Sequence, residues 1–141
     1  MKSRHTHADG QLLEQELTRQ IIGGFYTTYD GLGYGFLESV YRRSLAHVLT
    51  RAGLSVECEA LIDVWFDGIH VGHYRTDMLV EGKVVVELKA IERLVPANRK
   101  QLMNYLRGSK LEVGLLFNFG PMAQFERVVY SNSRKDFSSS K

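Results

Sequence analysis

The sequence has little of several features that would each point to one kind of protein. Cys58 is its single cysteine, so an internal disulfide and a cysteine-based zinc site are both excluded. No apolar run reaches the roughly 18 residues of a membrane-spanning helix. The first ten residues also lack the apolar stretch of a secretory signal. We therefore expect a cytoplasmic protein without a membrane partner.

Charge of one sign is also scarce. The chain carries 18 Lys and Arg against 16 Asp and Glu, a net charge of +2. Nucleic-acid-binding domains are often more basic, so the overall charge gives such a partner little support. Several basic residues either line one surface or stand as separate solvated positions: Arg42, Arg43, Arg93, Arg99, Lys100, Arg107 and Lys110.

Length and composition fit one domain. The chain has 141 residues, of which 44% are hydrophobic, enough for a core of ordinary size. We expect this domain to cover residues 11–132. A polar, flexible N-terminus (1–10) precedes it, and a serine-rich flexible tail (133–141) follows it.

The apolar pattern predicts three helices and a larger number of strands. The helices are expected at 12–29, 36–52 and 97–107, the second ending at Gly53 and the third beginning after Pro96. Asp67-Gly68 indicates a hairpin between the first two strands. The strands are expected at 56–66, 69–80, 84–89, 112–118 and 125–131. This order predicts an α/β fold in which a mixed β-sheet is flanked by helices.

Charged residues interrupt the most apolar of these strands, Val84–Lys89. Because side chains alternate along a strand, Glu87 and Lys89 point to the same face. An ionised group is costly to bury without a partner. Such a pair in a central strand therefore suggests a functional site, although an ordinary ion-pair cluster at a sheet end is the alternative.

The position of Asp77 depends on the turn before this strand. A three-residue turn centred on Gly82 places Asp77 opposite Glu87, whereas a two-residue turn shifts the register and separates them. Two adjacent carboxylates repel unless a proton or a cation lies between them. A hard divalent ion would satisfy the pair. With Lys89 stabilising negative charge, the group would suit metal-assisted hydrolysis of a phosphodiester.

Glu38 allows two interpretations. It falls in the first turn of the second predicted helix, where an acid is favoured by the helix dipole alone. It also flanks the helix face that carries Tyr41 and Leu45, so its side chain could face the sheet and join the acids there.

Two motifs resemble a known family. The spacing Asp77-x9-Glu87-x-Lys89 resembles the signature of the PD-(D/E)xK nuclease superfamily, with Thr76 in the loosely kept position of its proline. Gly35-x-x-Glu38-x-x-Tyr41 resembles the motif that names the GxxExxY proteins of that superfamily. Further similar stretches are 53–57, 64–68, 86–94 and 114–120.

The resemblance implies a restriction-endonuclease-like αβββαβ core with an extra N-terminal helix. It makes Glu38, Asp77 and Glu87 ligands of Mg²⁺ or Mn²⁺, and Lys89 the catalytic lysine. Gln101 and Tyr105 resemble the Gln-x3-Tyr motif of the RecB-like exonucleases, where both approach the active site. Asn98 stands where relatives often carry a histidine, so this position cannot shuttle protons at neutral pH.

We therefore expect a nuclease that acts on nucleic acid, with DNA as the preferred substrate. The alternative is a module of the same fold that binds nucleic acid or protein without turnover. Such a module would need a protein partner or a second copy of the chain. The sequence leaves open whether cleavage is internal or terminal, and whether RNA is also a substrate.

Overall fold

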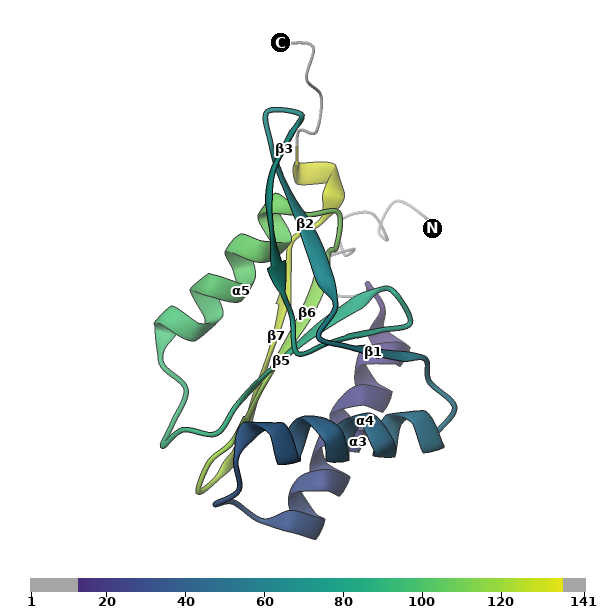
Figure 1. Cartoon of the computed structure of the whole chain (residues 1–141), viewed down its shortest axis with the longest axis vertical. Coiled ribbons are helices and arrows are strands. Elements are labelled where there is room, and N and C mark those ends of the chain that lie inside the picture. Colours follow the sequence, from purple (N-terminus) through teal and green to yellow (C-terminus); the bar gives the residue numbers. More distant parts are fainter. Residues whose placement is uncertain (1–12, 136–141) are drawn as a thin grey trace, which may run out of the picture.

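The computed structural model describes residues 13–135 (Figure 1). The predicted flexible N-terminus, residues 1–10, lies outside the described residues, as does the tail from residue 136. The elements follow one another as α3 (Gln15–Leu32), α4 (Glu38–Arg51), β1 (Val56–Cys58), β2 (Leu61–Phe66), β3 (Ile69–Arg75), β4 (Met78–Val80), β5 (Val84–Lys89), α5 (Pro96–Gly108), β6 (Val113–Phe119), β7 (Ala123–Val129) and the 3-10 helix η1 (Asn132–Arg134).

The centre of the molecule is a five-stranded sheet in the order β1-β4-β5-β6-β7. Strands β5 and β6 run parallel, and the other pairs are antiparallel. Helices α3 and α4 pack on one face and α5 on the other, as Figure 1 shows. This arrangement confirms the predicted α/β class with a mixed sheet flanked by helices. None of the described helices is long and apolar enough to cross a membrane.

The long strands expected at 56–66 and 69–80 are each divided in two, which corrects the sequence prediction. The divisions fall at Glu59-Ala60 and Thr76-Asp77, and hydrogen bonds of 2.9 Å join Glu59 N to Asp77 O and Thr76 N to Ala60 O. The inner halves, β1 and β4, form the edge of the main sheet. The outer halves, β2 and β3, form a separate two-stranded ribbon, which projects to the top of Figure 1. A bend at this point gives each half its own direction.

The turn between β4 and β5 has the three-residue length that a pairing of Asp77 with Glu87 requires. Lys83 N donates to Val80 O at 3.0 Å, and Glu81 and Gly82 both take positive φ angles of 56° and 65°. The resulting register pairs Met78 with Val86 and Val80 with Val84. The three-residue turn is thus confirmed, and the position opposite Glu87 falls to Asp77.

An aromatic stack fixes the helices over the sheet. The ring of Phe25 lies 4.3 Å from that of Phe117, and the ring of Tyr41 lies 4.1 Å from that of Phe119. Tyr41 also donates its hydroxyl to Gly33 O at 2.7 Å. Helix α3 ends at Leu32, three residues later than predicted, because Gly33 takes a positive φ of 69°. The glycine-rich loop that follows is held at the start of α4.

A buried amide holds the segment that follows β5. Asn118 accepts from Ile91 N and donates to Ile91 O, both at 3.0 Å, and donates to Gln124 Oε1 at 3.1 Å. Gln124 in turn accepts from Leu94 N at 3.0 Å. Gly120 lies against Ile91 O, leaving no room for a Cβ atom. This network positions the connection from Lys89 to α5.

We predict that Gly120→Ala destabilises the fold. The added methyl group would overlap the Ile91 carbonyl and force the backbone to shift, which typically costs about 1–3 kcal/mol. Gly23→Ala is the matched control, because a Cβ atom there meets no neighbour and a helical alanine stabilises by about 0.5–1 kcal/mol. Urea denaturation of both variants checks the prediction. Equal stability of the two would contradict it.

Candidate active site

The site forms where β4 bends away from β5. Past Val86, side chains bond to the edge of β5 that β4 leaves, while the other edge stays paired with β6. Leu88 N donates to Asp77 Oδ2 at 2.8 Å, and the Thr76 hydroxyl donates to Val86 O at 3.1 Å. Thr76 is fully buried and Asp77 half-buried. Asp77 is therefore fixed beside the end of β5.

Glu87 lies next to Asp77 in an environment that disfavours its charge. Burial, and then the neighbouring Asp77 carboxylate, raise the pKa of Glu87 to about 8. Its Oε2 atom is buried and has no hydrogen-bond partner among the described residues. The structure thus brings together the two acids that the register predicted, and leaves one carboxylate oxygen unsatisfied.

Lys89 shares the face of Glu87. Val85, two residues before Glu87, packs with Leu102 and Leu106 of α5, so strand alternation directs Glu87 and Lys89 toward the same side. The charge of Lys89 opposes the upward pKa shift of Glu87, and its side chain is half-buried. An ammonium group at this place can balance negative charge that develops near the acids.

Helix α5 reaches the site through a pair of tyrosines. The ring of Tyr105 stacks on that of Tyr74, with centroids 3.6 Å apart and planes 10° from parallel. Burial, and then the charge of Glu87, raise the pKa of the Tyr74 hydroxyl, which is buried without a hydrogen-bond partner in the described part of the chain. Gln101 lies one turn before Tyr105 on the exposed surface, and no hydrogen bond between described residues joins it to the acids.

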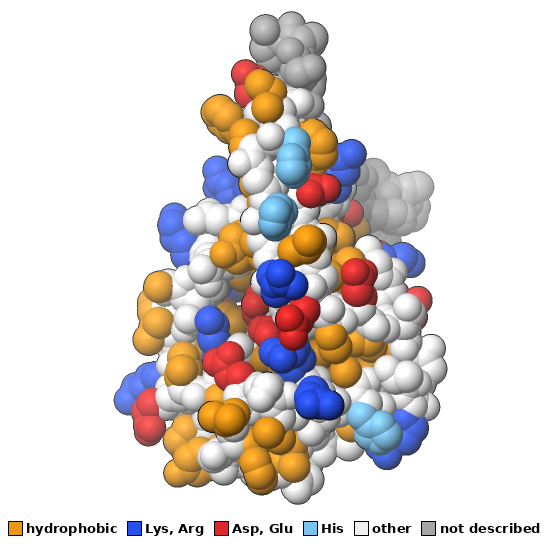
Figure 2. Space-filling model, in the orientation of Figure 1, with side chains coloured by type: hydrophobic (Ala, Val, Ile, Leu, Met, Phe, Trp, Pro, Cys, Tyr) orange, Lys and Arg blue, Asp and Glu red, His pale blue; other side chains and the backbone are white. Residues whose placement is uncertain are grey.

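Helix α4 reaches the site through Arg42. Its guanidinium lies 3.5 Å from Asp77 Oδ1 and 3.2 Å from Glu59 Oε2, and Arg75 lies 4.0 Å from Glu59 Oε1. On the face shown in Figure 2, acidic and basic side chains gather at the foot of the ribbon. From the sequence, Arg42 is one of several basic residues without a link to the acids, and Tyr74 has no predicted role, although Arg42 follows Glu38 by one helical turn, a spacing that places both on one stripe.

Glu38 is not joined to the other two predicted ligands. It is exposed, and no group of three or more His, Cys, Asp or Glu side chains within residues 13–135 is arranged to hold a metal ion. Helix α4 packs through Tyr41 and Leu45 against the face of the sheet that carries Val86 and Leu88. The side chain of Glu87 points to the opposite face.

The two joined acids nevertheless suit a divalent ion. Magnesium in enzymes is commonly held by one or two carboxylates, with water and substrate phosphate completing its shell. Asp77 and Glu87 provide such a pair, and the unpartnered Oε2 of Glu87 is an acceptor that a cation would satisfy. The residues present therefore fit the ion that the sequence predicted.

We predict that Glu87 makes stability depend on pH in metal-free buffer. Its pKa is raised from 4.5 to about 8, so between these values the folded chain holds a proton that the unfolded chain has lost. Stability should then fall as the pH rises from about 4.5 to about 8 and level off above, with a contribution approaching about 1.4 kcal/mol per pH unit.

Urea denaturation at several pH values in EDTA measures this slope. Glu87→Gln should flatten it, because a neutral amide replaces the protonated carboxyl. Glu57→Gln, at an exposed position of β1, should leave it unchanged. An identical slope in the wild type and Glu87→Gln would show that Glu87 titrates normally.

Comparisons with known proteins agree with this geometry. A family model described as the PD-(D/E)XK nuclease superfamily matches residues 15–128. The crystal structure of SSO0001 superposes with a TM-score of 0.53 at 19% sequence identity, over 91% of this chain and 62% of that one. That likeness concerns the fold, and the chain spans less than two thirds of that protein. No curated protein matches the chain. The family match covers most of the sequence, so the chain belongs to the PD-(D/E)XK nuclease superfamily.

Proposed function

We propose that this protein is a nuclease that hydrolyses phosphodiester bonds in DNA, with Mg²⁺ or Mn²⁺ as its cofactor. One observation carries the proposal: Asp77 and Glu87 are held side by side, with a Glu87 oxygen buried and unpartnered. Burying such a pair costs free energy, so its presence suggests that the protein uses it. Membership of a nuclease superfamily supports that use.

Asp77 and Glu87 would hold the ion. Glu38, the first residue of α4, is the proposed third ligand. Its exposed side chain would have to turn from solvent toward Asp77 and Glu87. When bound, the ion supplies positive charge that polarises the phosphodiester and stabilises its transition state. The carboxylate of Asp77 already has a fixed orientation, because one oxygen accepts from Leu88 N.

Lys89 and Arg42 supply the remaining positive charge. The Lys89 ammonium can donate to a phosphate oxygen or orient the attacking water, since it lies on the face of Glu87. The guanidinium of Arg42 would bind the phosphate beside Asp77, for which its fork of donors is suited. Gln101 and Tyr105 are proposed to orient the strand along α5. The stacking of Tyr105 on Tyr74 makes that side of the site rigid.

The Gly35-x-x-Glu38-x-x-Tyr41 motif supports a finer placement in the GxxExxY family. Gly35 takes a positive φ of 116°, and Tyr41 is buried and bonded to the loop at Gly33. These two residues thus shape the start of α4. Glu38 is exposed and makes neither a hydrogen bond nor an ion pair within the described residues, so its place in the motif favours a functional role.

A second candidate function is a binding module without turnover. The observation that favours it is the ion-pair network in which Arg42 joins Asp77 to Glu59. In this network the positive charge of Arg42 balances the negative charge of Asp77 without a metal ion. Under this alternative the protein would bind nucleic acid, or a protein partner, or a second copy of itself, through the same surface.

We predict that Mg²⁺ or Mn²⁺ stabilises the protein at pH 8. An ion that binds only the folded state at 100 times its dissociation constant adds about 2.7 kcal/mol. Thermal unfolding with and without the ion measures this gain. Asp77→Asn and Glu87→Gln should abolish it, whereas Glu57→Gln should keep it. No stabilisation of the wild type would favour the binding module.

We also predict metal-dependent cleavage of DNA that requires Lys89. Labelled single-stranded DNA, double-stranded DNA and RNA are incubated with Mg²⁺, Mn²⁺ or EDTA. Lys89→Met should lower the rate by roughly 100-fold or more, a common effect of removing one transition-state donor, and Glu87→Gln should remove activity. Lys83→Met, in the exposed β4–β5 turn, is the matched control. Cleavage that persists in Lys89→Met and Glu87→Gln would refute the assignment.

A further inference from the structure

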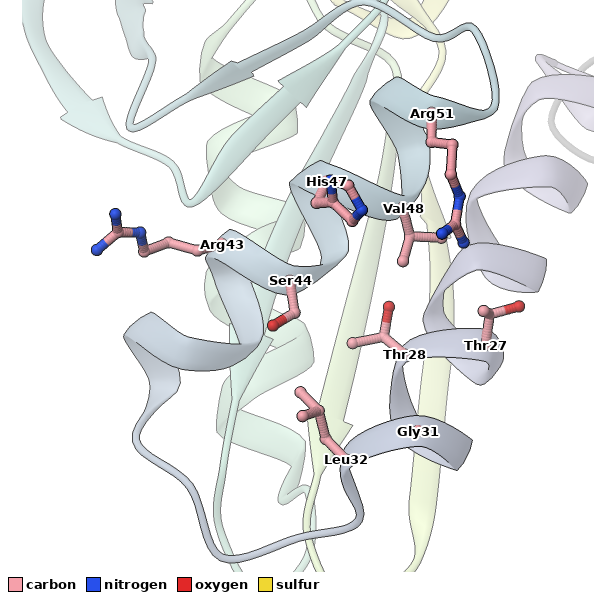
Figure 3. A pocket seen from close by; sticks show the side chains of 9 residues that line it. All are labelled: Thr27, Thr28, Gly31, Leu32, Arg43, Ser44, His47, Val48 and Arg51. Carbon is pink, nitrogen blue, oxygen red and sulfur yellow. The ribbon is translucent and has the colours of Figure 1, made fainter.

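A groove lies between helices α3 and α4, away from the acidic pair. The two helices pack tightly near Gly24, where a Cβ atom would come within 2.6 Å of Leu49 Cδ2. Toward the end of α3 they leave a space of about 470 Å³ (Figure 3). It is lined by Thr27, Thr28, Gly31, Leu32, Arg43, Ser44, His47, Val48 and Arg51.

The lining combines an apolar floor with a polar rim. Leu32 and Val48 contribute the apolar surface, and Ser44 contributes a hydroxyl group. In Figure 3 the side chains of His47 and Arg51 extend from α4 into the space between the helices, whereas Arg43 points away from it. A ligand that fits this lining has an apolar part and an anionic part.

Within the described residues, no acidic side chain pairs with the basic residues of α4 that line this groove. Among residues 13–135, no carboxylate lies within ion-pair distance of Arg43, His47 or Arg51, whereas ion pairs are formed by Arg19, Arg42, Arg75 and Arg99. The three positions follow one another by four residues, a rise of about 6 Å each. Because Arg43 points away from the groove, Arg51 and His47 are the basic side chains that can donate to one anionic group inside it.

The groove and the acidic pair lie on opposite sides of α4. Arg51 follows Arg42 by nine positions, which at 100° per residue is half a turn around the helix. Nine residues also rise about 13.5 Å along the axis, so with a helix diameter of about 10–12 Å the two sites are roughly 17 Å apart. That span equals about five nucleotide steps at a rise of 3.4 Å per nucleotide.

Exposed aromatic rings lie on the path between the two sites. The loop before α4 carries Tyr34 and Phe36, which are 61% and 46% exposed. The same loop lines a smaller cavity with Ala90 and Ile91, the residues that follow Lys89. Aromatic rings beside a basic groove are how many proteins bind single strands, because every base can stack on them.

We propose that the groove between α3 and α4 holds a nucleotide of the nucleic-acid strand, a few positions from the one cleaved. The phosphate would bind Arg51 and His47, and the base or sugar would lie on Leu32 and Val48. This inference rests on the proposed nuclease function and adds a second contact for the same substrate. A free mononucleotide has the same chemistry, so the experiment must distinguish the two sources.

The test is the binding of a labelled single-stranded oligonucleotide in EDTA, followed by fluorescence anisotropy at several salt concentrations. Gly31→Phe adds a ring at a position that lines the groove, where a Cβ atom meets no neighbour. Gly23→Phe is the matched control, since its Cβ atom is equally free and it lies outside the groove. We expect Gly31→Phe to weaken binding at least tenfold and Gly23→Phe to leave it unchanged.

Charge removal gives an independent measurement. Arg51→Gln should lower the slope of log affinity against log salt by about 0.7, the value for one phosphate of a single strand. Lys83→Gln removes the same charge from an exposed position that does not line the groove and should not change the slope. Thermal unfolding establishes that each variant is folded.

The outcomes separate this inference from the proposed function. Wild-type binding in Gly31→Phe and Arg51→Gln, by a protein that cleaves DNA, overturns the groove assignment and leaves the nuclease function intact. A wild type that neither binds nor cleaves overturns both. Tight binding of free thymidine monophosphate, lost in Gly31→Phe while strand binding persists, overturns the assignment to a strand.

Discussion

The structure depends on how the backbone of β5 is hydrogen-bonded beyond Val86, where its neighbour β4 has bent away. Buried backbone groups need partners, and here two side chains provide them. The Thr76 hydroxyl bonds to Val86 O and the Asp77 carboxylate to Leu88 N. The chain can therefore leave the sheet without exposing unpaired groups. The same bonds fix Asp77 beside Glu87.

This constraint sets the electrostatic character of the site. The Asp77 carboxylate takes the place of β4 beside β5, so it must lie close to β5. Asp77 therefore stays near Glu87 and raises the pKa of Glu87. Without a cation, that pair reduces stability at neutral and higher pH. Active sites often retain such unfavourable arrangements because removing them would remove the function. Arg42 and Lys89 offset part of the repulsion from two different elements.

Much of the fold and half of the site could be predicted from the sequence. The sequence allowed two registers for the turn before Val84–Lys89, and the one centred on Gly82, which the structure has, places Asp77 opposite Glu87. These features are local, and local patterns are what a single sequence records. The bend at Thr76-Asp77 was missed because alternation continues through it. The bend is stabilised by bonds between the Thr76 and Asp77 side chains and the backbone of β5, which alternation does not record.

The rest of the site depends on packing between elements. Tyr74 approaches Glu87 only because the ribbon folds onto α5, where its ring meets Tyr105. Arg42 reaches Asp77 around the end of the sheet. Glu38, by contrast, shares a helix with Arg42 but stays exposed. Helix spacing places Glu38 on the same stripe as Arg42, yet it does not show which side chains of that stripe reach the acids.

The projecting ribbon has a mechanical consequence. Strand β3 runs to Arg75, and only Thr76 separates its end from Asp77. A tilt of the ribbon would thus turn the peptide that carries this carboxylate, while the tyrosine stack on α5 resists the motion. Val64 of the ribbon also lies against Gly108 at the end of α5, so helix and ribbon together support the position of Asp77. The far end of the ribbon presents Phe66 and Ile69, 73% and 60% exposed, so a partner bound there would contact the same element that leads into the acids.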